Sequence, residues 1–331
     1  MLNKALKLNE KMFDEDVVVS PTRAGFGEGI VALGEMDPNV VVLTADLSES
    51  TKCDGFEKKF PERFFDVGVA EQNMAAVAAG FGVSGKTAFI SSYATFSPGK
   101  NWETIRTTIV YNESNVKIAG HHSGIATGPD GATHQATEDI AITRVWPGME
   151  VYVPCDAIEA RKATIAAGKT TKPTYLRFSR EKTPVMTTDE TPFEQGKLAE
   201  FWVSDKPSVT IFGTGYVLFQ APLAAKELEK ENIEVSVVNV ASIKPLDSEK
   251  AVELARKSGA VVTIEDHQIA GGLAGVLAET FAKHYPVPME FVGLADTFAE
   301  SGSMKELMKK YHVDKDAVKQ AVRTVLPRKS K

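Results

Sequence analysis

The fold is decided by the stretch GVAEQNM at residues 68–74, which joins an apolar run to an Ala-rich segment. The run before it, residues 64–67, is typical of a short strand, and residues 74–81 predict a helix. Glu71 therefore lies at a strand-to-helix turn. A carboxylate there can cap the helix N-terminus, or it can meet a ligand, because ligands of open α/β sheets bind at the carboxyl ends of strands. We favour the second interpretation and treat Glu71 as a binding residue.

Outward from this turn, β-branched runs alternate with amphipathic or Ala-rich segments, which is the order of an α/β protein. The apolar runs are unbroken rather than alternating, so we expect mostly parallel sheets covered by helices on both faces. In the first part of the chain the expected strands are residues 40–46, 63–67, 87–91, 116–120, 150–153 and 174–178. The expected helices there are residues 22–36, 74–81 and 102–111.

A second, smaller α/β unit follows residues 183–195, which carry several Pro and Thr residues and are interpreted as a linker. Its expected strands are residues 208–213, 234–240 and 260–265, and its expected helices are residues 221–230, 250–258 and 273–284. A chain of 331 residues exceeds what one core usually organises, so two domains are expected. We divide the chain into a polar, mobile leader at residues 1–20 and domains at residues 21–190 and 191–331.

The composition argues against several classes of protein. With 43% hydrophobic and 25% charged residues, the chain is ordinary for a soluble globular protein. A net charge of −6 provides no basic field that would gather the phosphates of a nucleic acid. The two cysteines, Cys53 and Cys155, have no metal or redox spacing, which suits a reducing cytoplasm. No apolar stretch approaches a membrane-spanning length, so we expect a soluble, cytoplasmic chain that binds neither nucleic acid nor a membrane.

The most unusual loop is residues 121–134, which follows the expected strand at 116–120. It contains three glycines and three of the six histidines, namely Gly124, Gly128, Gly131, His121, His122 and His134. A glycine-rich loop with clustered titratable groups after a buried strand is more often a site than a plain connection. Near it in the expected sheet, Tyr93 and Phe96 place two aromatic rings three residues apart.

Taken in order, these residues resemble the pyrimidine-binding and C-terminal domains of transketolase, a family of enzymes that use thiamine diphosphate. The resemblance covers residues 23–325 and rests on six motifs in the family's order. They are Arg23, ADL at residues 45–47 with Ser50, GVAE at residues 68–71, His122, DGATH at residues 130–134, and FSR at residues 178–180. The resemblance implies an α/β fold, with a parallel-sheet pyrimidine-binding domain followed by a smaller α/β C-terminal domain.

One motif of the family is absent from this chain. The family binds the diphosphate and its Mg²⁺ through a Gly-Asp-Gly motif in a further, N-terminal domain, and the similar tripeptide here, PDG at residues 129–131, lies in the histidine loop. The resemblance therefore implies the C-terminal subunit of a split transketolase. A separate N-terminal subunit would hold the diphosphate and Mg²⁺, and this chain would supply no metal ligand. A self-dimer flanked by two partner chains, an α2β2 assembly, is also implied.

The resemblance assigns roles at the cofactor. Glu71 would be the catalytic carboxyl group that bonds the far nitrogen of the cofactor's aminopyrimidine ring and drives its change of tautomer. Tyr93 and Phe96 would form the wall on which that ring packs, and Asp46 would be a further cofactor-binding residue. Where the family places a third aromatic residue this chain has Gly99, so that part of the pocket departs from the family pattern.

The resemblance also implies sugar phosphates as substrates, with a two-carbon ketol unit passed from a ketose phosphate to an aldose phosphate. The guanidinium group of arginine can donate two parallel hydrogen bonds to one phosphate, and histidine and serine add further donors. The residues at the family's phosphate-binding positions are Arg23, Ser50, His122 and Arg180. Asp130 and His134 match the residues that bind the donor's hydroxyls, and His134 can also transfer a proton. Whether the sugars are those of the pentose phosphate pathway stays open.

Four other functions fit the sequence less well. The β subunit of a 2-oxo acid dehydrogenase's decarboxylating component also has a glutamate at this turn, but it has no use for the four phosphate-binding residues. A deoxyxylulose phosphate synthase normally comes as one full-length chain. A non-catalytic regulatory subunit of the same fold would be expected to lose Glu71, Asp130 and His134, which are intact. A nucleotide-binding oxidoreductase would need a glycine fingerprint that the chain lacks.

Overall fold

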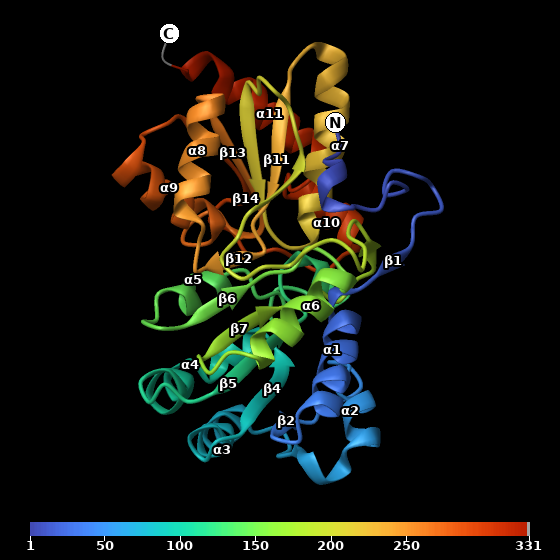
Figure 1. Cartoon of the computed structure of the whole chain (residues 1–331), viewed down its shortest axis with the longest axis vertical. Coiled ribbons are helices and arrows are strands. Elements are labelled where there is room, and N and C mark those ends of the chain that lie inside the picture. The colour runs from blue at the N-terminus through green and yellow to red at the C-terminus, as the bar shows by residue number, and fades with distance from the viewer. Residues whose placement is uncertain (330–331) are drawn as a thin grey trace.

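Two α/β units, each built around its own sheet, lie one above the other in the computed structural model, which describes residues 1–329 (Figure 1). The lower, first unit has a seven-stranded sheet and the upper, second unit has a five-stranded sheet. Most strand pairs in both sheets are parallel. The α/β class and the predominance of parallel strands are therefore confirmed.

The sheet of the first unit has the strand order β12-β6-β7-β5-β4-β2-β3. Its parallel strands are β2 (Val40–Thr44), β3 (Phe64–Asp66), β4 (Thr87–Tyr93), β5 (Val116–His121), β6 (Glu150–Tyr152) and β7 (Thr174–Arg177). At one edge, β12 (Ser242–Lys244) pairs antiparallel with β6. Because β12 comes from beyond the expected linker, the second half of the chain contributes a strand to the first sheet.

Helices cover both faces of this sheet because successive residues of a strand point to opposite sides. In β2, Val40 and Val42 belong to one buried cluster, whereas Val41 and Leu43 belong to another. Three helices pack on the Val40 side, namely α1 (Thr22–Met36), α2 (Asp54–Lys59) and α6 (Ala157–Gly168). On the opposite side lie α3 (Glu71–Val83), α4 (Trp102–Thr104) and α5 (Asp139–Arg144).

The second unit repeats this three-layer plan on a smaller scale. Its sheet has the order β14-β13-β10-β11-β9, with only β9 antiparallel to its neighbour among the strands described. The strands are β9 (Ala199–Trp202), β10 (Val209–Gly213), β11 (Val235–Asn239), β13 (Val261–Gln268) and β14 (Met289–Leu294). The helices are α7 (Gln220–Leu228), α8 (Ser248–Ser258), α9 (Leu273–His284), α10 (Met304–Lys310) and α11 (Lys315–Val325). The apolar faces of α7 and α11 share one buried cluster, and those of α8 and α9 share another.

The leader at residues 1–20 is packed against the second unit, so the prediction that it is mobile is wrong. Met12 is fully buried in the same cluster as Phe201 of β9. The amide of Asn3 donates to the carbonyl of Phe201 at 3.0 Å. Farther along, β1 (Val19–Ser20) pairs antiparallel with β8 (Thr183–Pro184). The few apolar residues of the leader are scattered among charged ones, and this pattern hid their burial.

Other boundaries differ from the sequence-based expectations in local ways. The expected linker at 183–195 is tied down, because the carboxylate of Asp156 accepts hydrogen bonds from the amides of Met186 at 2.8 Å and Thr187 at 2.6 Å. The expected helix at 102–111 is the short α4 followed by a wider, π-type segment, Ile105–Val110. Helices α1 and α9 have the expected bounds, whereas α2, α5, α6, α10 and α11 were missed. Within residues 1–329, no helix is long and apolar enough to cross a membrane.

Burial of the leader leads to a prediction about stability. Met12→Ala should lower the free energy of unfolding by about 2–5 kcal/mol, because truncation of a buried methionine removes apolar contacts and leaves a cavity. Met36→Ala is the matched control, since Met36 is 57% exposed and its loss should change stability by less than about 0.5 kcal/mol. Urea denaturation of both variants measures the difference. Equal effects would show that the leader does not contribute to the folded core.

Candidate active site

Four of the expected site residues follow the carboxyl ends of neighbouring parallel strands. Asp46 follows β2, Tyr93 ends β4, His122 follows β5, and Arg180 follows β7. Because these strands are parallel and adjacent in the order β7-β5-β4-β2, their carboxyl ends meet at one edge of the sheet. The remaining residues come from helix starts and loops at this edge.

Glu71 is the first residue of α3 and is only 3% exposed. Its carboxylate Oε2 accepts from Lys100 Nζ at 2.7 Å, and among residues 1–329 no amide of α3 donates to this carboxylate. Its main-chain carbonyl accepts from Asn101 Nδ2 at 3.0 Å. The carboxylate therefore faces the segment Thr95–Lys100, which carries Phe96, instead of capping its own helix.

Asp66, at the end of β3, holds the turn that leads to Glu71. Its Oδ1 accepts from the amide of Gly68 at 2.9 Å and from the amide of Asp46 at 3.0 Å. Gly68 has φ +70°, in the left-handed region where a residue without a Cβ is unstrained. Asp66 and Lys100 were not predicted as site residues, although a carboxylate that ends an otherwise apolar run was a usable signal for Asp66.

An aromatic wall lies between the two halves of the site. The rings of Tyr93 and Phe96 stack with centroids 5.7 Å apart and an interplanar angle of 12°. Tyr93 also stacks on His122 at 3.8 Å, and His134 meets Phe96 edge-on at 5.4 Å. The structure thus brings together the two rings and two of the loop's three histidines, His122 and His134.

Arginine side chains lie next to His122 and are held in place by main-chain carbonyls. Arg23 Nη1 donates to the carbonyl of Ser50 at 2.6 Å, and Arg180 Nη1 donates to the carbonyl of Thr127 at 3.0 Å. Four expected residues, Arg23, Ser50, His122 and Arg180, are therefore neighbours although they are far apart in the sequence. His121, to which no role was given, is buried between Phe26 and Phe178.

The charges in this cluster affect the protonation of His122. Burial, followed by the nearby Arg23, Arg180 and His134, lowers the pKa of His122 to about 3, so that its imidazole is neutral at physiological pH. Burial and the charge of Arg180 also lower the pKa of Arg23. Arg23 Nε and His122 Nδ1 are buried without a hydrogen-bond partner among residues 1–329. Buried nitrogen atoms left unpaired beside two arginines are typical of an anion-binding site.

Asp46 and Asp130 lie at the exposed rim of the site. Both side chains are exposed and make no hydrogen bond within the part of the chain that the structure describes. Asp130 ends the 3-10 segment Ile125–Asp130, and His134 follows it on the half-buried part of the loop. The proximity of these aspartates to a ligand stays a prediction.

The residues present fit one half of thiamine diphosphate. The buried Glu71 carboxylate next to the Tyr93–Phe96 wall suits an aminopyrimidine ring, and Thr95 Oγ1 and Asn101 Oδ1 close by are buried and unpartnered within residues 1–329. Over the same residues, no three His, Cys, Asp or Glu side chains are grouped so that they could hold a metal ion. The described chain therefore offers a place that suits the ring.

Comparisons with known proteins identify the family to which the two units of the chain are similar. The family pattern described as "Transketolase, pyrimidine binding domain" matches residues 20–186, and "Transketolase, C-terminal domain" matches residues 201–318. A protein named as a transketolase C-terminal section, from Methanocaldococcus jannaschii, is 41% identical over 89% of this chain and 93% of its own length. An apulose-4-phosphate transketolase subunit of Phocaeicola vulgatus is 32% identical over 89% of this chain and 94% of its own length. A 6-deoxy-6-sulfo-D-fructose transketolase subunit of a Clostridium species is 34% identical, over 91% and 93%.

Solved structures give the same result. A structure described as a split gene transketolase, inactive beta4 tetramer, is 43% identical with a TM-score of 0.88, over 94% of this chain and 99% of that chain. The transketolase of Campylobacter jejuni shares the fold, with a TM-score of 0.80 at 20% identity, over 95% of this chain and 50% of that one. The chain therefore belongs to the transketolase family and comprises its pyrimidine-binding and C-terminal domains.

Proposed function

We propose that this chain is the C-terminal subunit of a split transketolase, which transfers a two-carbon ketol unit from a ketose phosphate to an aldose phosphate. The observation that carries the proposal is the pairing of two half-sites at one sheet edge. A buried carboxylate, Glu71, borders the aromatic wall on one side, and the Arg23–His122–Arg180 cluster lies on the other. The first suits a cofactor ring and the second suits the anionic end of a sugar.

Glu71 acts as the proton-exchanging group of the cofactor site. Thiamine diphosphate, when bound, supplies the electron sink that allows the bond next to a ketose carbonyl to break. Lys100 Nζ donates to Glu71 Oε2 at 2.7 Å, so Glu71 Oε1 would be the carboxylate oxygen left to bond the far nitrogen of the pyrimidine ring and to exchange a proton with it. Tyr93 and Phe96 would exclude water from the face of that ring.

His134 and Asp130 hold the reacting end of the sugar. His134 is half-buried, lies edge-on to Phe96, and can accept or return a proton at a donor hydroxyl. Asp130, exposed nearby in the same loop, accepts a hydrogen bond from a second hydroxyl. Asp46, at the rim beside the Glu71 turn, contacts the cofactor.

The other end of the sugar is an anion. Arg23 and Arg180 supply two fixed positive charges, while the neutral His122 and the hydroxyl of Ser50 supply hydrogen-bond donors. Two relatives are named for an apulose 4-phosphate and for a 6-deoxy-6-sulfo-fructose, so both named sugars carry a terminal anion. We assign this chain a phosphorylated ketose and aldose, with xylulose 5-phosphate and ribose 5-phosphate of the pentose phosphate pathway as the first pair to test.

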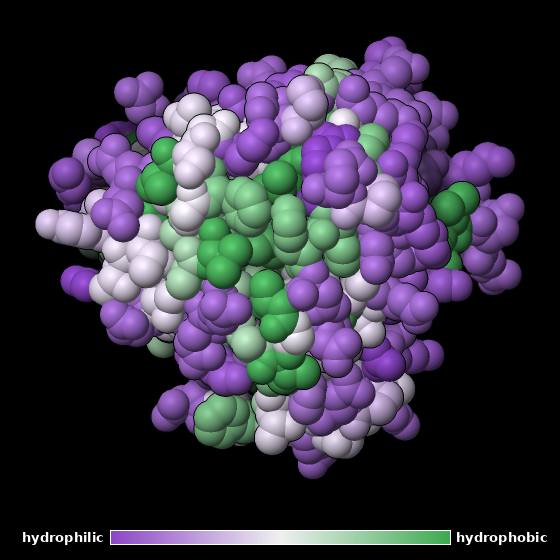
Figure 2. Space-filling model, turned by 90° about the horizontal axis from the view of Figure 1, so that it is seen from below, coloured by the Kyte–Doolittle hydropathy of each residue, from purple (hydrophilic) through white to green (hydrophobic). Residues whose placement is uncertain are grey.

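The partner is a separate N-terminal subunit that carries the diphosphate and Mg²⁺. An apolar face at the lower end of the first unit supports this proposal (Figure 2). Near Glu71, large apolar side chains are exposed on α3, on the turn before it and on the edge strand β3, namely Phe65, Val69, Val77 and Val83. A soluble protein rarely leaves such a patch uncovered beside its site. We call these four residues the α3 patch.

The complete assembly is an α2β2 heterotetramer, in which two copies of this chain pair and two diphosphate-binding subunits flank them. A similar structure is described as an inactive beta4 tetramer, which is consistent with self-association of such chains and with the absence of activity when they are alone.

Both cysteines are buried and unpaired, as is usual for a cytoplasmic protein.

A reconstitution assay tests the proposed function directly. Ketol transfer from xylulose 5-phosphate to ribose 5-phosphate is measured with thiamine diphosphate and Mg²⁺, first with this chain alone and then with a diphosphate-binding subunit. We expect turnover only in the mixture. Turnover by this chain alone would contradict the proposal that it holds only half of the active site. A complex that forms but transfers no ketol unit would contradict the substrate class.

Glu71→Gln should reduce kcat in the reconstituted enzyme by about 10²–10⁴-fold, because an amide cannot exchange the proton. The affinity for the diphosphate-binding subunit should not change. Glu28→Gln on the exposed face of α1 is the matched control and should leave kcat unchanged. Normal turnover of Glu71→Gln would remove Glu71 from the mechanism.

Val77→Lys should raise the Kd for the diphosphate-binding subunit at least about tenfold, because it puts a charge in the middle of the α3 patch. Val18→Lys in the leader is the control, since Val18 is 68% exposed and outside the patch. Sedimentation velocity over a range of concentrations measures both affinities. Equal affinities for the two variants would exclude the α3 patch as the contact surface.

His122 should stay neutral from pH 8 to pH 5, because its pKa is about 3. Arg180→Gln removes one of the charges that disfavour the protonated imidazole, so it should raise the pKa of His122. Arg161→Gln, on α6 and paired with Asp189, should not change it. NMR titration of labelled histidine, assigned with His122→Gln, measures the three values. A wild-type His122 that titrates near pH 6.5 would contradict the cation cluster.

A further inference from the structure

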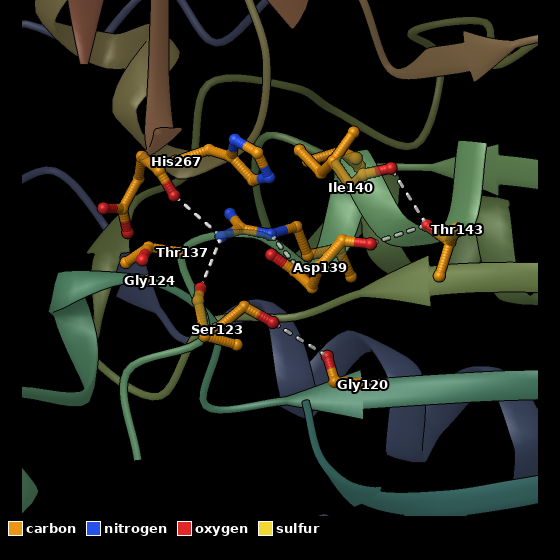
Figure 3. A network of polar contacts seen from close by, with 12 residues as sticks. Gly120, Ser123, Gly124, Thr137, Asp139, Ile140, Thr143 and His267 are labelled. Carbon is orange, nitrogen blue, oxygen red and sulfur yellow. Dashed lines mark hydrogen bonds and ion pairs between the residues drawn. The ribbon is translucent and has the colours of Figure 1, made fainter. Parts of the chain in front are cut away.

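The loop that carries His122, Asp130 and His134 is bound to the second unit as well as to its own. The amide of Ile125 donates to Asp266 Oδ1 at 3.1 Å, and Asp266 belongs to β13. Farther along the loop, Gln135 Nε2 donates to the carbonyl of Glu300 at 3.1 Å. In Figure 3, Ser123 and Gly124 of this loop and Asp139 of the first unit lie near His267 of the second.

The contact at Asp266 is unusually close. Gly124 has φ +72°, and a Cβ added there would lie 1.8 Å from Asp266 Oδ2. The carboxylate thus fills the space that any other side chain at position 124 would need. Asp266 is 1% exposed, and its Oδ2 also accepts from the hydroxyl of Tyr216. Its position is therefore fixed from both sides.

Short connections lead from this contact to the substrate-binding residues. Thr127 Oγ1 donates to the carbonyls of Gly124 and His122, and the carbonyl of Thr127 accepts from Arg180 Nη1 at 3.0 Å. A shift of the Gly124–Ile125 peptide would therefore displace both His122 and Arg180. Among residues 1–329, neither Asp266 nor Tyr216 forms a hydrogen bond with Arg23, His122 or Arg180.

A second contact between the units, close to the first, is different in kind. Arg177 pairs with Asp139 at 2.8 Å and donates to the carbonyl of Asp266 at 2.7 Å. The ion pair lies within the first unit and is buried, and the same guanidinium reaches the main-chain carbonyl of Asp266 in the second unit. This contact helps to hold the two units together but uses no atom of the Asp266 side chain, whose carboxylate is left to the loop.

We propose that Asp266 of the second unit is a positioning residue for the substrate-binding loop of the first, and that its carboxylate holds the Ile125 amide so that His122, Arg180 and His134 face the anionic sugar. The proposal rests on the proposed function for the identity of the ligand. The C-terminal domain is then part of the active site through its hold on the loop. It contributes to substrate affinity without touching the substrate.

Hydrogen exchange of the full chain tests the hold on the loop without any need for activity. Asp266→Ala should speed exchange of the amides at residues 123–131 by at least about tenfold, because a buried charge-assisted hydrogen bond is lost. Asp266→Asn should restore much of the protection, since its amide oxygen can still accept from Ile125. Exchange at residues 64–83, around Glu71, should not change in either variant.

Two further variants separate positioning from general loss of stability. Tyr216→Phe keeps the carboxylate and removes one donor to it, so it should speed exchange in the loop by a smaller factor and should fold even where Asp266→Ala does not. Thr210→Val removes a buried hydroxyl from the far end of the same sheet, where it bonds Ser258 Oγ at 2.9 Å. It should leave exchange at residues 123–131 unchanged. Unchanged loop exchange in Asp266→Ala and Tyr216→Phe, or an equal rise in Thr210→Val, would overturn the proposal.

Kinetics of the reconstituted enzyme give the second readout. Asp266→Ala and Tyr216→Phe should raise KM for xylulose 5-phosphate by about three- to tenfold, with kcat changed less than about twofold and the affinity for thiamine diphosphate unchanged, whereas Asp266→Asn should keep KM near the wild-type value. An unaltered KM, with turnover of the wild type intact, would overturn the positioning role and leave the proposed function standing. If the wild-type mixture has no turnover, the proposed function fails, and the exchange experiment still decides whether Asp266 holds the loop.

Discussion

The parallel register of β2, β4, β5 and β7 is the constraint on which the rest of the structure depends. Parallel neighbours end at one edge of a sheet, so residues more than a hundred positions apart, such as Asp46 and Arg180, arrive at the same place. The unbroken apolar runs that bury both faces of the strands also keep their register. A slip of one residue in any strand would turn its terminal side chain away from the site.

The electrostatics of the site follow from the charged and titratable side chains that meet at this edge of the sheet. Two guanidinium groups lie beside an imidazole, and no carboxylate within the described residues neutralises them fully; Glu181 reaches Arg180 only at 3.4 Å. The folded chain tolerates this arrangement because the imidazole of His122 is neutral and because main-chain carbonyls accept hydrogen bonds from both arginines. Such a site is prepared for an anion before the anion arrives, which is the form of preorganisation that favours binding.

Much of this could be predicted from the sequence, because it depends on local patterns. The apolar spacing in residues 22–36 gave α1 its bounds, and the polar residues after buried strands gave Glu71 and the loop at 121–134 as site candidates, whereas Arg180 came from the resemblance to transketolase. The leader was misjudged because Met12 is buried against strands nearly two hundred residues away, and no local pattern reports that. Lys100 and Asp266 were missed as site residues for the same reason: each matters only through a partner that the fold brings close.

Asp266 shows why a buried polar contact between domains can be useful although it adds little to stability. Burial raises the pKa of its carboxyl group, whereas Arg177, Tyr216 and the Ile125 amide act in the opposite direction. A buried carboxyl group of this kind is a poor way to gain stability, since apolar residues of the same volume often stabilise a junction as well or better. Apolar contacts, however, tolerate sliding, whereas a hydrogen bond to one amide specifies one position of the loop. Because there is no room for a side chain at Gly124, the junction selects a single arrangement of the loop. A site that must recognise both ends of a sugar requires such a single arrangement.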